Sequence, residues 1–166
     1  GGDTSVRTGR DWLIQSSIVD LKGNASIQTG QDLTLKADLQ KTEVRQYLRK
    51  GSNNYYDLNS DFQNSVMTIG KDASINTGRD FTIDSSDFTI IGNASIDSKR
   101  DLNILSENSV EQHYFYERSG NKNVESNTVI EHAEGSRLKI LGAFASIEAG
   151  RDTMILGLCE SPMTFT

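Results

Sequence analysis

The residues of this chain best suited to chemistry are a row of aspartates, two histidines and one cysteine. The aspartates recur at one place in a repeated stretch, which is clearest at residues 74–83 as SINTGRDFTI. Paired carboxyl groups can act as general acid and base on polysaccharides, but an active site occurs once in a chain and this aspartate occurs in every copy. We therefore predict turn and capping roles, and no catalytic role, for Asp11, Asp32, Asp80, Asp101 and Asp152.

The two histidines are candidate metal ligands. His113 and His132 are placed to face each other across a hairpin, with Glu111 or Glu131 as further ligands. An equivalent stretch earlier in the chain carries Val44 in place of His113, so the arrangement is not repeated and we predict no metal site. The nonapeptide pattern of calcium-binding β-rolls, G-G-x-G-x-D, is also absent from the sequence.

The single cysteine, Cys159, has no histidine near it in the sequence. This favours a small, half-buried residue over a nucleophile, and a lone cysteine excludes an intrachain disulfide framework. The candidate groups together predict a chain that is not an enzyme and that holds no metal and no cofactor.

Five copies of one ten-residue stretch organise the chain. The other four are SVRTGRDWLI at Ser5, SIQTGQDLTL at Ser26, SIDSKRDLNI at Ser95 and SIEAGRDTMI at Ser146. The aspartates of the five copies follow one another after 21, 48, 21 and 51 residues. A repeat of this length is typical of a solenoid and is too short for paired helices or a propeller blade. The sequence therefore predicts an all-β fold, a β-solenoid of about 21 residues per coil whose coils stack at about 4.8 Å.

Glycine marks the tight turn of the repeat at Gly9, Gly30, Gly78 and Gly150. We expect a positive φ there, which glycine adopts without steric cost. Lys99 takes this place in the fourth copy, so we expect that corner to be looser or to use a different turn. The inward residues predicted for the first coil are Val6, Trp12, Ile14, Ile18 and Leu21.

Stacking brings like residues of successive coils above one another. It predicts a core ladder of isoleucines and a serine hydroxyl ladder at a corner or on an inner shelf. Two stacked aspartate carboxylates about 5 Å apart would repel each other by roughly 3 kcal/mol at an effective dielectric constant near 20. The arginines that precede four of the aspartates can neutralise the row. The isoleucines are Ile27, Ile75, Ile96 and Ile147; the serines are Ser5, Ser26, Ser74, Ser95 and Ser146; the arginines are Arg10, Arg79, Arg100 and Arg151.

Two insertions interrupt the repeat, at 40–63 and 108–134, and each reads as strand, Gly/Asn turn, strand. They match each other at an offset of 69 residues, as do Asp11 with Asp80 and Asp32 with Asp101. We predict two protruding β-hairpins, roughly 10 Å apart on one side of the coils, that can pack as a small side sheet. The alternative is that each insertion is a degenerate extra coil.

Aromatic residues gather in these insertions. Cross-strand aromatic pairs stabilise hairpins, and tyrosine-rich strands are also a candidate contact surface for a receptor, a glycan or a neighbouring fibre. An exposed hairpin edge can in addition pair with another chain by strand addition. The residues concerned are Tyr47, Tyr55, Tyr56, Tyr114, Phe115 and Tyr116.

Composition limits the function classes. The chain has 166 residues, 35% of them hydrophobic, which suits a narrow solenoid forming a single domain over 1–166. A net charge of −6 argues against nucleic acid as the partner. No apolar run is long enough to cross a bilayer, there is no signal-peptide pattern, and the chain opens inside a repeat, so we expect a piece of a longer protein.

The motif G-x-x-S-I-x-[TSA]-G-[RQ]-D-[LFW]-x-[IL] resembles the haemagglutinin-type repeats of filamentous haemagglutinin and of the contact-dependent growth inhibition effectors. Gly9-Arg10-Asp11, Gly30-Gln31-Asp32, Gly78-Arg79-Asp80 and Gly150-Arg151-Asp152 carry the resemblance, and Lys99-Arg100-Asp101 departs from it. Filamentous haemagglutinin and these effectors are two-partner secretion exoproteins of Gram-negative bacteria. The resemblance implies a right-handed parallel β-helix, secreted through an outer-membrane transporter, in a cell-surface fibre that serves virulence by adhesion or toxin delivery.

The function predicted from these features is structural and interactive: a non-enzymatic segment of a secreted surface fibre, monomeric as isolated, that contacts a receptor or glycan of a target cell. One alternative is a β-helix enzyme acting on polysaccharide, which predicts a single groove with clustered charged residues. The other is a trimeric segment of a secretion or phage spike, which predicts interlocked chains.

Overall fold

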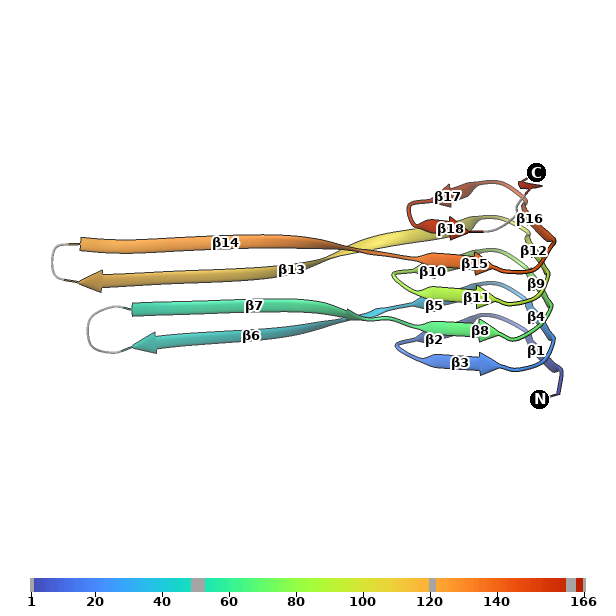
Figure 1. Ribbon diagram of the computed structural model, residues 1–166, viewed down its shortest axis with the longest axis horizontal. Coiled ribbons are helices and arrows are strands. Elements are labelled where there is room, and N and C mark those ends of the chain that lie inside the picture. The colour runs from blue at the N-terminus through green and yellow to red at the C-terminus, as the bar shows by residue number, and fades with distance from the viewer. Residues whose placement is uncertain (1, 49–52, 120–121, 161–163, 166) are drawn as a thin grey trace. The chain divides into compact units, whose positions relative to one another are not determined.

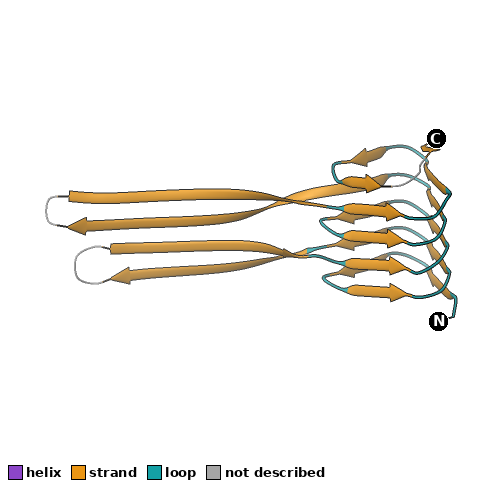
Figure 2. Ribbon diagram, in the orientation of Figure 1, coloured by secondary structure: helices purple, strands orange, loops and turns teal. Residues whose placement is uncertain are grey.

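The computed structural model describes residues 2–48, 53–119, 122–160 and 164–165. Across these residues the chain is all-β, with strands joined by short loops and no helix (Figure 2), so no helix there is long and apolar enough to cross a membrane. The chain divides into two compact units. The coil unit comprises Gly1–Asp38, Asn64–Glu107 and Gly135–Thr166, and the hairpin unit comprises Leu39–Gln63 and Asn108–Glu134.

The coil unit consists of three parallel sheets that the chain visits in rotation (Figure 1). The first sheet contains β1 (Thr4–Thr8), β4 (Ala25–Thr29), β9 (Ala73–Thr77), β12 (Ala94–Ser98), β16 (Ala145–Ala149) and β19 (Thr164–Phe165). The second contains β2 (Trp12–Gln15), β5 (Leu33–Lys36), β10 (Phe81–Asp84), the start of β13 (Leu102–Ser119) and β17 (Thr153–Ile155). The third contains β3 (Ile18–Leu21), β8 (Val66–Ile69), β11 (Asp87–Ile90), β15 (Arg137–Ile140) and β18 (Leu158–Glu160).

The strand pairing follows the sequence repeat. Ile27 pairs with Ile75 across the first insertion, Ile75 pairs with Ile96, and Ile96 pairs with Ile147. All four side chains are buried, because alternate residues of a strand point to opposite faces. The predicted isoleucine ladder is therefore confirmed.

One predicted core residue of the first coil is wrong. Ile18 is 81% exposed, and Val19 and Leu21 pack against the core instead. Strand register explains the error, because Val19 pairs with Met67 and Leu21 with Ile69, which fixes the inward phase of β3. Ser16, two residues before β3, has a left-handed φ of 46°, and so does its counterpart Ser85, two residues before β11.

Gly30, Gly78 and Gly150 act through their lack of a Cβ and not through a positive φ, so the predicted reason for them is wrong. None of the described glycines has a left-handed φ. A Cβ on Gly78 would overlap the carbonyl group of Gly30 in the coil beneath it. Lys99 keeps the corner hydrogen bond of its glycine counterparts, with its N–H 3.1 Å from the Thr77 carbonyl oxygen, so the corner is not looser in this respect.

Serines form a ladder inside the coil unit, at a position other than the predicted one. Buried Ser65, Ser86 and Ser136 stack at one corner. The Ser65 N–H donates to Ser86 Oγ, and the Ser86 N–H donates to Ser136 Oγ, each over 3.3 Å. The predicted set points outward: Ser5, Ser26, Ser74 and Ser95 are exposed and Ser146 is half-buried.

The hairpin unit is one antiparallel sheet with the strand order β6-β7-β13-β14. It comprises β6 (Asp38–Leu48), β7 (Asn53–Gln63), the outer part of β13 and β14 (Lys122–Gly135). β7 pairs antiparallel with β13, joining the two insertions over the register Glu111↔Asn59 to Tyr116↔Asn54. The predicted packing of the two hairpins into one sheet is confirmed, and the alternative of degenerate parallel coils is wrong.

Candidate binding surface

The repeat aspartates cap the backbone of the next coil. Asp11 Oδ1 accepts the Asp32 N–H at 3.1 Å, and Asp32 Oδ1 accepts the Asp80 N–H at 3.1 Å. Asp80 Oδ1 in turn accepts the Asp101 N–H at 3.3 Å. These bonds satisfy backbone N–H groups at the corners, outside the hydrogen bonding between strands. They agree with the turn role predicted for this row.

Arginines neutralise the row by reaching to the aspartate of the preceding coil. Arg100 Nε donates to Asp80 Oδ1 at 2.6 Å, and Arg151 Nε donates to Asp101 Oδ1 at 2.9 Å. These hydrogen bonds lower the pKa of Asp80 and the pKa of Asp101 below the ordinary value. A general acid needs a raised pKa, so the electrostatics of these two carboxylates oppose that role.

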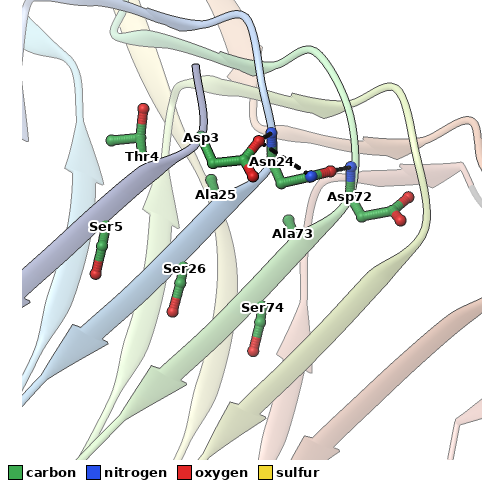
Figure 3. A pocket seen from close by; sticks show the side chains of 9 residues that line it. All are labelled: Asp3, Thr4, Ser5, Asn24, Ala25, Ser26, Asp72, Ala73 and Ser74. Atoms are coloured by element: carbon green, nitrogen blue, oxygen red, sulfur yellow. Dashed lines mark hydrogen bonds between the residues drawn. The ribbon is translucent and has the colours of Figure 1, made fainter.

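A shallow hollow of about 420 Å³ lies over the first strands of the first sheet (Figure 3). Its rim holds a second capping ladder: Asp3 Oδ1 accepts the Asn24 N–H at 3.0 Å, and Asn24 Oδ1 accepts the Asp72 N–H at 3.2 Å. Exposed Ser5 and Ser26 line the hollow beside them. Sequence reasoning missed this ladder, although Asp or Asn stands two residues before the motif serine in four of the five copies.

The aromatic residues of the hairpin unit are divided between two faces. Tyr56 lies opposite Tyr114, and Tyr55 lies opposite Phe115. Because adjacent residues of a strand point to opposite faces, Tyr56, Tyr114 and Tyr116 share one face, and Tyr55 and Phe115 share the other. We call these the Tyr56 face and the Tyr55 face. Tyr47 belongs to β6, and its side chain lies outside the described part of the chain.

The two faces differ in chemistry. On the Tyr56 face, the Arg45 guanidinium lies 5.4 Å from the ring centroid of Tyr56, a cation–π distance. On the Tyr55 face, Tyr55 is 38% and Phe115 37% exposed, so this pair offers apolar ring surface to solvent.

A polar cluster on the Tyr55 face joins the two insertions. His113 Nε2 lies 2.7 Å from Glu111 Oε1, and His113 Nδ1 lies 2.6 Å from Asp57 Oδ1. The hydrogen bond to Glu111, aided by the charge of Asp57, raises the pKa of His113. His132 Nε2 lies 3.9 Å from Glu111 Oε2, so the structure brings both histidines to one glutamate, and Asp57 is the member that sequence reasoning missed.

Among the described residues, no group of three or more His, Cys, Asp or Glu side chains is arranged to hold a metal ion. Cys159 lies in β18 opposite Leu138, and its side chain is outside the described part of the chain. At the end of the aspartate row, Arg151 Nε lies 3.4 Å from Asp152 Oδ2.

Comparison of the chain with protein-family models, with curated proteins and with solved structures gives no match. No family is shown. The candidate surfaces therefore have to be judged by their own geometry and charge.

Proposed function

We propose that this chain is a segment of a right-handed parallel β-helix in a secreted, filamentous haemagglutinin-type surface fibre of a Gram-negative bacterium, where it serves adhesion or toxin delivery. The observation that carries the proposal is the in-register stacking of the motif through three parallel sheets. A column built this way extends by adding coils, each bound only to its neighbours, which suits a long fibre.

The chemistry of the coil unit supports a scaffold role in preference to an enzyme. Its most regular polar row is used in corner hydrogen bonds and in ion pairs between coils. Asp80 and Asp101 have lowered pKa values, whereas a polysaccharide hydrolase needs one carboxyl group with a raised pKa. The polysaccharide-active alternative therefore receives no support from this row.

We assign contact with the target cell to the hairpin unit, and within it to the Tyr55 face. Tyr55 and Phe115 are opposite each other and partly exposed, and aromatic rings of this kind bury large apolar area or stack on sugar rings. The partner we propose is a receptor or glycan of the target cell. The parent protein would also meet its outer-membrane secretion transporter, and the net charge of −6 disfavours nucleic acid.

Cell binding by the purified chain tests this assignment. Two paired variants are compared with the unchanged chain: Tyr55→Ser with Phe115→Ser on the Tyr55 face, and Tyr56→Ser with Tyr114→Ser on the Tyr56 face. Circular dichroism first checks that both keep their strand content. We expect the first pair to lose binding to target cells and the second to retain it.

Equal binding by both variants would overturn the choice of face, and no binding by the unchanged chain would overturn the adhesive role. Sedimentation of the same samples addresses the spike alternative, because interlocked chains would give a trimer at every concentration. Hydrolysis of added polysaccharide would favour the enzyme alternative.

A further inference from the structure

The hairpin sheet has two edges with no further strand beside them in the described part of the chain. β6 ends the strand order on one side, and β14, which pairs with β13, ends it on the other. Such an edge presents a row of backbone N–H and C=O groups that can accept another strand.

The internal repeat identifies the strand that fits each edge. The two insertions match at an offset of 69 residues, so β14 is the counterpart of β7 and β13 is the counterpart of β6. Inside the chain, β7 of the first insertion pairs with β13 of the second. The same junction repeated once more would join β14 to a strand like β6.

We propose that β14 of one copy of this chain pairs antiparallel with β6 of a second copy, in the register of the β7–β13 junction. Shifting each strand of that junction by 69 residues places Thr42 opposite Thr128, Val44 opposite Ser126 and Arg45 opposite Glu125. This inference rests on the repeat and the register, not on the adhesive role proposed above.

The charges and the β-branched residues of the paired positions agree with this register. Of the five pairs from Thr42 opposite Thr128 to Gln46 opposite Val124, none puts like charges together, and one puts Arg45 against Glu125. Opposite-charge and β-branched cross-strand pairs stabilise antiparallel strands. A register shifted by one residue would turn every side chain of the added strand to the other face of the sheet and would lose this match.

The two charged residues also lie on the same face. Arg45 packs over Tyr56. Glu125 lies close to Tyr114: the pKa of Tyr114 is raised mainly by burial and then by the negative charge of Glu125 and a hydrogen bond with it. Both therefore belong to the Tyr56 face. In the proposed junction they stand where Tyr56 and Tyr114 stand within the chain, so a charge pair replaces an aromatic pair.

The junction is heterologous: each copy uses β14 toward one neighbour and β6 toward the other. Contacts of this type grow into open chains of copies unless the rotation closes a ring. We expect the isolated segment to be monomeric when dilute, as its sequence predicts, and to form linear assemblies as its concentration rises.

A charge-swap experiment tests the register by sedimentation. Copies carrying Arg45→Glu and copies carrying Glu125→Arg are measured alone and mixed. Each variant alone would oppose like charges in every junction, whereas in the mixture each junction between unlike copies joins one positive and one negative residue. Glu148→Arg, at an exposed position in β16 of the coil unit, is the control for the change in net charge of Glu125→Arg.

We expect the unchanged chain, the control and the mixture to gain mass with concentration, and each charge variant alone to remain monomeric. Circular dichroism checks that both variants fold, and recovery on mixing separates lost pairing from lost folding. The proposal fails if the unchanged chain stays monomeric at every concentration. It also fails if either variant assembles alone, or if the mixture does not recover.

Discussion

The coil unit and the hairpin unit are both made of β-strands, yet they are stabilised in different ways. In the coil unit, alternate residues are almost wholly buried, as in β4 and β5. In the hairpin unit, nearly all described residues of β14 are exposed, and its larger apolar residues include the exposed Val44, Val124, Val129 and Ile130. Hydrophobic burial stabilises the first unit, whereas cross-strand pairs and polar contacts hold the second.

The difference shows where a β-repeat protein is free to vary. Each coil must fit the coils above and below it, so its corner glycines, inward isoleucines and capping aspartates are tied to the stack. The hairpin unit has to satisfy only its own strand pairing, and nearly all residues of its β14 strand are exposed to solvent. A scaffold and a contact surface are the roles that these two kinds of packing suit.

The largest expected effect comes from a corner of the coil unit. Gly78→Ala places a Cβ against the carbonyl group of Gly30, so the corner has to shift, and we expect unfolding free energy to fall by about 1–3 kcal/mol. Gly9→Ala is the matched control, because a Cβ there meets nothing within 4 Å. It should be neutral or stabilise by up to about 1 kcal/mol.

Denaturant unfolding of the two variants measures this contrast. A similar loss in both would mean that the corner glycines are not required for close stacking, which would contradict the distinction between the tightly stacked coils and the open hairpin sheet.

Acid should weaken the coil unit through its arginine–aspartate pairs. The pKa of Asp80 and the pKa of Asp101 are lowered in the folded chain. Their contribution to stability is therefore fully present above the ordinary pKa near 3.8 and is lost as the pH falls through the lowered values. Arg100→Gln should flatten this acid dependence, as followed by thermal unfolding at several pH values. An unchanged profile would mean that Arg100 does not stabilise the Asp80 carboxylate.

The smallest effect is expected at the junction of the two hairpins, and it has the opposite pH dependence. His113 lies between Glu111 and Asp57 with a raised pKa. Its stabilising contribution is fully present below the ordinary pKa near 6.5 and is lost as the pH rises through the raised value. Hydrogen exchange of the β7 and β13 amides should speed up over that range beyond its intrinsic rise with pH.

His113→Gln removes the titrating ring and should abolish this extra dependence, whereas His132→Gln, 3.9 Å from Glu111 at its closest, should change it less. An effect confined to coil-unit amides would contradict the assignment of the group.

Much of the fold follows from the sequence because the repeat is strict. The period, the isoleucine ladder and the two hairpins follow from spacing, since stacking makes every like position contact its counterpart. The phase of β3 does not, because it depends on the pairing of Val19 with Met67 and of Leu21 with Ile69 across the first insertion. The reason for Gly78 could not be predicted either, since a close approach of two backbones and a positive φ both require glycine.

The candidate surface was harder to predict than the scaffold. The aromatic residues are conspicuous in the sequence, but their division between two faces depends on the β7–β13 register. The approach of Asp57 to His113 has the same origin, because it joins residues 56 positions apart across two separate insertions. Neither local propensity nor the 21-residue period carries that information.

The most direct test of the division between scaffold and contact surface is a chain in which residues 40–63 and 108–134 are each replaced by a short Gly/Asn turn. Its thermal unfolding and its binding to target cells are measured beside those of the unchanged chain. We expect the shortened chain to unfold cooperatively with its strand signal intact and to lose cell binding. Undiminished binding would contradict the account, because the contact surface would then lie on the coils.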